Sequence, residues 1–372
     1  GKVIDGHAPG LRGDAAKKYI AAGITTDHEC FTKEEALDKL KYGMKIQIRE
    51  GSAAKNFDSL IDLLDEYPNK IMFCSDDKHP NDLVAQHINT LAKRAVAHGC
   101  DIMNVLRACT YNIVKHYSMN VGLLQPNDPA DFCIVDNLKD FNCKATYISG
   151  ELVAENGETK INSVEEIPIN NFKCSPVSVA QIAVQATSSK VKVIEVEDGQ
   201  LITKKGETAL APEEGMLVSD TAQDVLKVVV VNRYFDAPPA IAFIRNFGLK
   251  QGALASCVAH DSHNIIAVGV SDDDIVKAIN LVVESKGGIS LANGSEQKIL
   301  PLPVAGIMTN KDGYETAEAY EKLDLRAKEL GVTLGAPYMT MSFCALLVIP
   351  ELKLSDKGLF DGNKFEFTSL EV

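Results

Sequence analysis

The chain has 372 residues, of which 45% are hydrophobic and 24% are charged. This length exceeds one ordinary hydrophobic core and predicts two or three domains. With 38 basic and 51 acidic residues the net charge is −13, which argues against nucleic-acid binding and favours a small-molecule ligand. The sequence has no apolar run of 18 residues and no stretch with the form of a signal peptide, so a cytoplasmic protein without membrane contact is expected.

The nine cysteines are scattered and include no Cys-x-x-Cys pair. Their odd number and irregular spacing argue against a disulfide framework and against a structural zinc knot. We therefore expect reduced thiols.

Residues 1 to about 120 repeat a strand–loop–helix pattern. Successive strands lie about twenty residues apart, the spacing of βαβ units around a parallel sheet. Asp14 is predicted to cap the first helix, and Thr32 with Glu35 has the form of a capping box for the second. We predict strands at 2–7, 24–29, 44–48 and 70–74, helices at 12–23, 32–43 and 57–68, and a helical segment at 83–117 whose second part is 101–117.

The pattern changes after residue 120. Residues 121–158 hold short apolar stretches broken by Pro, Asn, Asp and Gly, which predicts a small antiparallel β unit, and residues 164–172 are expected to be a linker. From about residue 170 a hairpin at 191–207, further strands and helices at 272–287 and 316–331 predict an α+β domain with its helices on one side of the sheet.

Three of the first four predicted strands end in residues that commonly bind metals. His7 follows the first strand, His28 the second and Asp76 the fourth. Because the loops after parallel strands meet at one edge, we expect these side chains to converge. Two imidazoles and a carboxylate favour Zn, Mn or Fe over Ca or Mg, and such an ion activates water for hydrolysis. The third strand ends instead in residues 49–52, Arg-Glu-Gly-Ser, a polar cluster suited to holding a substrate.

Each of these residues also has a purely structural interpretation. A single histidine at a strand end is more often hydrogen-bonded within the protein than a ligand, and an aspartate there often caps the next helix. The recurrence of three ligand types at equivalent positions favours the metal interpretation. Glu29 and Asp77 adjoin predicted ligands, and the sequence leaves open whether they face the site.

A second polar cluster lies in the segment VAHDSHN, which contains His260, Asp261 and His263. It is open to two functional interpretations, a second metal site or a loop that lends a group to the first. A turn between strands, held by side-chain hydrogen bonds, is the favoured interpretation. The remaining histidines are expected to be structural or solvated: His79, His87, His98 and His116.

The segments GHAPGL, AGITTDHE, IREGS and FCSDDKHP, in that order and followed by VGLLQPNDPADFCIVD, resemble the adenine deaminases of the amidohydrolase superfamily. The C-terminal region with VAHDSHN resembles the additional domain of those enzymes. The resemblance extends over essentially the whole chain. Each motif alone is weak, but the ordered set is specific.

The resemblance implies an α/β fold built on part of an amidohydrolase (β/α)₈ (TIM) barrel. Residues 1–120 would form barrel strands five to eight, residues 121–168 a small β domain, and residues 169–372 the adenine deaminase C-terminal α+β domain. His7, His28 and Asp76 would then bind a divalent transition metal. Manganese is expected, with Fe²⁺ or Zn²⁺ as alternatives, in a centre that is binuclear in the whole enzyme.

The resemblance also implies a reaction, the hydrolytic conversion of adenine to hypoxanthine and ammonia in purine salvage. Asp76 would take a proton from the attacking water and pass it to the departing amine, because ammonia leaves only when protonated. Asp76 is preferred to Asp77 because it directly follows the small residue that ends the strand. His28 is assigned to catalysis with Asp76, and the substrate-binding residues are expected to be Glu50, Ser52 and Asp77.

The sequence departs from the family in one respect. Such enzymes carry a His-x-His pair on barrel strand one and a bridging carboxylate on strand four, and this chain contains no His-x-His. We therefore expect a C-terminal portion that does not deaminate adenine alone, and a homo-oligomer, since a half-barrel has bare sheet edges. The alternatives are another amidohydrolase acting on a cyclic amide or N-acetyl substrate, and a non-catalytic scaffold.

Overall fold

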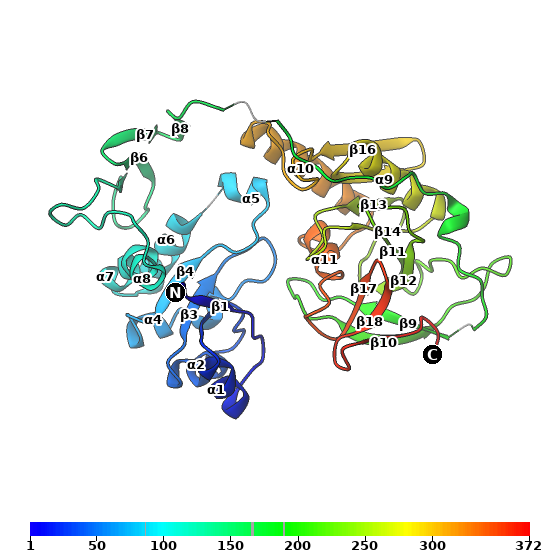
Figure 1. Ribbon diagram of the computed structural model, residues 1–372, viewed down its shortest axis with the longest axis horizontal. Helices are drawn as coiled ribbons and strands as arrows, with labels where there is room; N and C mark the ends of the chain where they lie inside the picture. Colours follow the sequence, from blue (N-terminus) through cyan, green and yellow to red (C-terminus); the bar gives the residue numbers. More distant parts are fainter. Residues whose placement is uncertain (86, 165–166, 189) are drawn as a thin grey trace. The chain divides into compact units, whose positions relative to one another are not determined.

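A computed structural model of the chain describes residues 1–85, 87–164, 167–188 and 190–372. The chain divides into two compact units, Gly1–Glu165 and Glu166–Val372 (Figure 1). The predicted linker at 164–172 and the predicted helix at 83–117 each include residues outside the described part.

The first unit is built on a parallel sheet in the order β1-β2-β3-β4. All four strands predicted for this region are confirmed, with ends that shift by no more than about two residues, the usual uncertainty of strand boundaries. Because the strands are parallel and consecutive, their carboxyl ends lie along one edge of the sheet. The strands are β1 (Ile4–Gly6), β2 (Ile24–Asp27), β3 (Lys45–Arg49) and β4 (Ile71–Cys74).

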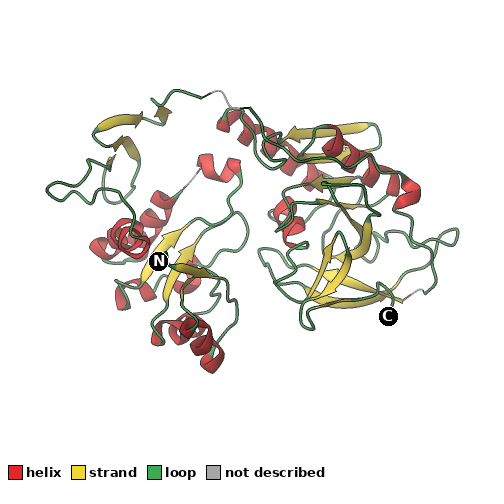
Figure 2. Cartoon of the chain, viewed as in Figure 1, coloured by secondary structure: helices red, strands yellow, loops and turns green. Residues whose placement is uncertain are grey.

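Helices lie beside this sheet (Figure 2). A hydrophobic core is formed by side chains of β3 and β4 together with those of α2, α3, α4, α6 and α7. The hydrophobic side chains of this core are buried because both layers present apolar residues to each other. The helices are α1 (Gly13–Ala21), α2 (Lys33–Lys41), α3 (Phe57–Leu60), α4 (Leu63–Glu66), α5 (Pro80–Ala85), α6 (Ile88–His98), α7 (Ile102–Leu106), a π-helical segment (Arg107–Tyr111) and α8 (Asn112–Tyr117).

Two local predictions for these helices were wrong. Asp14 does not cap α1, because Arg12 occupies the cap position and Asp14 lies in the first turn. The single helix predicted at 57–68 is two short helices, since the Leu64 amide bonds to the Ile61 carbonyl three residues back and tightens the chain there. The segment at 83–117, predicted as helical with a second part from residue 101, is confirmed as helical over most of its described residues and is divided close to that point.

That division has a clear cause in the sequence. Gly99 ends α6 in the left-handed conformation, with φ of +103°, which glycine adopts without a steric penalty. Asp101 then begins α7 by accepting hydrogen bonds from the amides of Met103 and Asn104.

A small antiparallel sheet completes the first unit, in the order β5-β6-β7-β8. It lies in the region where the sequence predicts short strands broken by turn residues, and Figure 1 shows it at the end of the unit beyond α8. The strands are β5 (Phe132–Val135), β6 (Cys143–Ile148), β7 (Glu151–Glu155) and β8 (Glu158–Thr159).

The second unit is organised around an eight-stranded mixed sheet in the order β10-β9-β12-β11-β14-β13-β15-β16. The predicted hairpin is confirmed as the antiparallel pair of β9 and β10. A three-stranded sheet, β17-β18-β19, adds to the unit. The strands are β9 (Lys190–Glu195), β10 (Lys204–Ala209), β11 (Val225–Val231), β12 (Ala240–Arg245), β13 (Ala253–Ser256), β14 (Ile265–Gly269), β15 (Gly288–Asn293), β16 (Glu296–Pro301), β17 (Leu352–Ser355), β18 (Gly358–Asp361) and β19 (Glu366–Phe367).

Helices lie on both faces of the large sheet, so the prediction of helices on one side was wrong. Val228 of β11 belongs to the same core as Tyr320 of α10 (Gly313–Glu329), whereas the adjacent Val229 packs in a core with Ile275 of α9 (Asp272–Glu284). β11 is buried at every position, and a strand buried on both faces requires a covering layer on each. A third helix, α11 (Pro337–Phe343), was not predicted and covers the same face as α10.

Within the described ranges, no helix is both long enough and apolar enough to cross a bilayer.

Candidate active site

The carboxyl edge of the parallel sheet brings the predicted ligands together. His7 follows β1 directly, His28 follows β2, and Asp76 comes two residues after the end of β4. Asp76 has a positive φ of +54°, a conformation that Asp tolerates better than most residues and that directs the chain sharply out of the strand. The edge of the sheet therefore positions all three side chains in the way that the sequence predicts.

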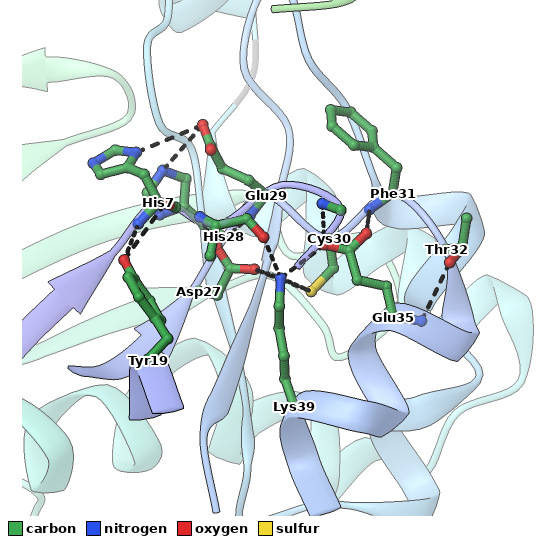
Figure 3. A network of polar contacts seen from close by, with 12 residues as sticks. His7, Tyr19, Asp27, His28, Glu29, Cys30, Phe31, Thr32, Glu35 and Lys39 are labelled. Atoms are coloured by element: carbon green, nitrogen blue, oxygen red, sulfur yellow. Dashed lines mark hydrogen bonds and ion pairs between the residues drawn. The ribbon is translucent and has the colours of Figure 1, made fainter. Parts of the chain in front are cut away.

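His7 and His28 lie in direct contact. Their ring centroids are 4.5 Å apart and their planes are inclined at 83°. Glu29 joins them, with its Oε1 atom 3.6 Å from Nδ1 of His7 and 4.0 Å from Nε2 of His28 (Figure 3). One ligand atom from each of the three residues lies within 4.8 Å of the others, close enough for all three to bind a single cation. The question that the sequence left open for Glu29 is thus answered, since Glu29 faces the site.

Asp76 stands beside this group and is held by an arginine. Its Oδ2 atom lies 3.7 Å from Nε2 of His28 and forms an ion pair with Nη1 of Arg49. The same guanidinium nitrogen is 3.5 Å from Oε1 of Glu29. Arg49 is only 2% exposed, so a buried positive charge connects the two carboxylates. The sequence placed Arg49 in a polar cluster suited to holding a substrate but did not predict its pairing with Asp76.

The site contains buried polar atoms that lack a hydrogen-bond partner: Nε2 of His28, Oε2 of Glu29, and Nε and Nη2 of Arg49. Buried polar atoms are rarely left in this state, and a cluster of them is typical of a ligand-binding site. An imidazole nitrogen and a carboxylate oxygen are donors to a divalent cation, and guanidinium N–H groups suit an acceptor such as a ring nitrogen or carbonyl. The residues therefore fit a metal ion together with a polar substrate.

The two imidazoles differ in their electrostatic surroundings. The polar contact with Glu29 raises the pKa of His7, while burial lowers the pKa of His28. The burial of His28 favours the neutral ring, which is the form that binds metals. The surroundings of His28 therefore suit a metal ligand, whereas the raised pKa of His7 means that a cation would compete with a proton for its ring.

Comparisons with known proteins identify the family to which the chain belongs. The profile of the "Amidohydrolase family" matches residues 1–153, and that of the "Adenine deaminase C-terminal domain" matches residues 200–366. An adenine deaminase of Methanosarcina mazei is 50% identical over an alignment that covers 100% of this chain and 69% of that protein. An adenine deaminase of Salinibacter ruber is 53% identical, with 98% of this chain and 67% of that protein covered.

This chain belongs to the adenine deaminase family.

A more distant adenine deaminase also matches nearly the whole chain. The adenine deaminase of Borreliella burgdorferi is 46% identical, and the alignment covers 98% of this chain and 68% of that protein. A solved β-aspartyl dipeptidase from Fervidobacterium islandicum AW-1 has 18% identity and a TM-score of 0.33, over 44% of this chain and 50% of that chain. That structural similarity is too low to inform the fold.

In this member of the adenine deaminase family, the three residues assigned to substrate binding have different surroundings. The Glu50 carboxylate pairs with Arg94 at 2.9 Å. The Ser52 hydroxyl donates to Asp82 and accepts the amide N–H of His79 at 2.7 Å. The carbonyl of Asp77 accepts the Ser52 amide at 2.9 Å. The contacts of Ser52 with His79 and Asp77 join the loop after β3 to the loop after β4, whereas the Glu50 pair joins the loop after β3 to α6.

The VAHDSHN segment lies in the second unit, between β13 and β14. The His260 ring stacks on Phe343 with 5.2 Å between centroids, and the carboxamide oxygen of Asn264 accepts the Arg233 amide. Among the described residues, both groups of His, Cys, Asp and Glu close enough to bind one cation lie in the first unit. These contacts support the interpretation as a turn.

The second of those groups comprises Asp27, Cys30 and Glu35, which are all buried. It is already filled by a positive charge from the chain, because the Lys39 ammonium lies within hydrogen-bonding distance of both carboxylates (Figure 3).

Proposed function

We propose that this chain contributes to a metal-dependent adenine deaminase, which hydrolyses adenine to hypoxanthine and ammonia. The observation that carries the proposal is the convergence of His7, His28 and Asp76 from three parallel strands in a chain 46–53% identical to curated adenine deaminases. We further propose that β1 to β4 correspond to strands five to eight of an amidohydrolase barrel, with domain boundaries near residues 120 and 168.

We assign the metal to His7, His28 and Asp76, as the sequence predicts, and add Glu29 from its position. A bound divalent ion lowers the pKa of a coordinated water to about 7, so that hydroxide is available at neutral pH. Manganese is the proposed metal, with Fe²⁺ or Zn²⁺ as alternatives, in a binuclear centre in the whole enzyme. The nitrogen and carboxylate donors here suit these ions better than Ca²⁺.

The proton transfers are assigned to Asp76, next to His28. Attack at C6 of adenine releases a proton from water, and the amine must gain one before it departs. Arg49 forms an ion pair with Asp76, and the N–H groups of its two unpartnered nitrogens, Nε and Nη2, are available to a purine acceptor atom. Glu50, Ser52 and Asp77 remain the proposed substrate-binding residues, with cytoplasmic purine salvage in a homo-oligomer as the setting.

The test is hypoxanthine formation from adenine. We would compare this chain, loaded with Mn²⁺, with a fusion in which the part of the Methanosarcina mazei relative outside the alignment, where we expect the His-x-His pair, precedes it. Because the chain contains no His-x-His, we expect turnover by the fusion only, and loss of that turnover in the fusion carrying His7→Ala. Hydrolysis of cyclic amides or N-acetyl compounds in place of adenine, or no activity and no bound metal in either protein, would overturn the proposal.

A further inference from the structure

A buried ionic cluster lies directly beneath the candidate metal ligands. It consists of Lys39 from α2, Asp27 at the end of β2 and Glu35, also from α2. We propose that this cluster is a positioning device, which holds the loop carrying His7 against the segment carrying His28 and Glu29 before any metal binds. The inference rests on the proposed function for its purpose, but the cluster itself is tested separately below.

The Lys39 ammonium is the centre of the cluster (Figure 3). It donates to Oδ2 of Asp27 at 2.6 Å, to Oε1 of Glu35 at 2.7 Å and to the carbonyl of Ala8 at 2.5 Å. The Cys30 thiol is 3.6 Å away. Three donors thus meet three oxygen acceptors, and Lys39 is only 1% exposed. One of those acceptors, Ala8, is the residue directly after His7.

The carboxylates of Asp27 and Glu35 accept hydrogen bonds from backbone amides in both the loop after β1 and the loop after β2. Oδ1 of Asp27 accepts the amides of Ala8 and Glu29, each at 3.2 Å. Both amides belong to residues at the site, one following His7 and the other belonging to Glu29 itself. A single carboxylate therefore fixes the spacing between the loop after β1 and the loop after β2.

The Glu35 carboxylate also joins the two loops by accepting one backbone amide from each. Its Oε1 atom accepts the Gly10 amide at 2.7 Å, and its Oε2 atom accepts the Phe31 amide at 3.2 Å. The predicted capping box is only half formed as a result. Thr32 caps the helix by accepting the Glu35 amide, but the Glu35 carboxylate joins the two loops.

A metal ion in the place of the Lys39 ammonium could also hold the two loops together, but only while the metal stays bound. Asp27, Cys30 and Glu35 lie close enough to bind a cation, and the ammonium of Lys39 occupies that place. An ammonium is attached to the chain and stays when metal is scarce. The ligands above it are thus arranged before the catalytic metal arrives, which reduces the ordering that metal binding must provide.

The second unit offers a matched control for burial and charge. Lys227 of β11 is also 1% exposed, and its ammonium lies 2.6 Å and 2.8 Å from the two oxygens of Asp272 and 3.1 Å from the Ile182 carbonyl. This pair joins β11 to the start of α9 and none of its contacts involves a candidate ligand. Loss of a buried lysine should destabilise the protein at either place, but only Lys39 should affect the ligands.

The experiment compares Lys39→Met with Lys227→Met in this chain, with Glu35→Gln as a milder variant in case the first does not fold. Hydrogen exchange of the metal-free chain measures the exchange rates of the amides in the two loops. Titration with Co²⁺, followed by absorption, measures the affinity of the imidazole–carboxylate group for a metal. For Lys39→Met we expect loop amides to exchange about tenfold faster or more. We expect Co²⁺ to bind about 10- to 100-fold more weakly, as for other residues that orient ligands.

For Lys227→Met we expect native exchange in the two loops and native Co²⁺ affinity. For Glu35→Gln we expect faster exchange at Gly10 or Phe31, because an amide group cannot accept at both positions. Unchanged loop exchange in folded Lys39→Met or Glu35→Gln, or equal effects of Lys227→Met on the loops, would overturn the positioning role. If the native chain binds no Co²⁺, the metal assignment fails, and the exchange data still decide whether the cluster holds the loops.

Discussion

The Glu29 carboxylate lies against the exposed imidazole of His7, with 3.6 Å between Oε1 and Nδ1. Because this contact raises the pKa of His7, Glu29→Gln should lower it toward the ordinary value of 6.5. Histidine NMR titration of the metal-free chain measures the change. His116, whose pKa is lowered by burial and by Lys45, serves as the internal control and should not move.

The same contact predicts a dependence of stability on pH. A histidine whose pKa rises on folding stabilises the folded state below its unfolded pKa, and this contribution is lost as pH rises through the folded pKa. The stability difference between the native chain and Glu29→Gln should therefore be larger near about pH 5.5 than near about pH 8. Urea unfolding at both pH values measures it, and a difference that grows toward high pH would contradict the assignment.

Arg49 neutralises the carboxylates of Asp76 and Glu29 in a buried position. Arg49→Met leaves them without a cation and should cost about 3–5 kcal/mol of stability, the usual effect of removing one partner from a buried ion pair. Added Mn²⁺ should restore more thermal stability to this variant than to the native chain, since it supplies the lost charge. Arg245→Met, which removes a more exposed pairing with Glu195, is the control. Equal responses of the two variants to Mn²⁺ would contradict the prediction.

Ser52 tests the substrate assignment. Its hydroxyl donates to Asp82 and accepts the amide of His79, so Ser52→Ala should cost about 1–2 kcal/mol of stability through two lost hydrogen bonds. If Ser52 also binds adenine, as the sequence predicts, the fusion enzyme carrying Ser52→Ala should have a higher KM with little change in kcat. A native KM in a destabilised variant would restrict Ser52 to linking the two loops.

The sequence was sufficient to predict that His7, His28 and Asp76 lie close together, because the ends of strands can be recognised in a sequence. The apolar runs before His7, His28 and Asp76 identify strands, and parallel strands bring the residues after them to a common edge. Glu29 was left undecided for a physical reason. The alternation of side chains assigns a direction only within a strand, and the strand predicted at 24–29 ends in the structure at Asp27, before Glu29.

Lys39 gave no signal at all in the sequence. On α2 it appears among charged residues that are typical of a solvated helix face, and it is buried only because two loops fold over it. The sequence did contain evidence that helices cover both faces of the large sheet, but the prediction did not use it. The unbroken apolar run of β11, Val228–Val231, already indicates a strand covered on both sides.

Lys353 gives a prediction for the second unit. It is fully buried on β17, where its ammonium contacts the carbonyls of Leu201 and Phe343, and burial lowers its pKa to about 8 from an ordinary 10.5. Below pH 8 both folded and unfolded states carry the proton, so the folded state bears the full cost of the buried charge. Between pH 8 and 10.5 the unfolded state binds more protons, and stability from this group rises with pH. Relative to Lys353→Met, the native chain should gain up to about 3 kcal/mol of stability across this range.

Urea unfolding at intervals across the range measures the gain, with the exposed Lys204→Met as a control that should keep the native slope. Parallel pH profiles for the native chain and Lys353→Met would mean that Lys353 keeps its proton in the folded protein.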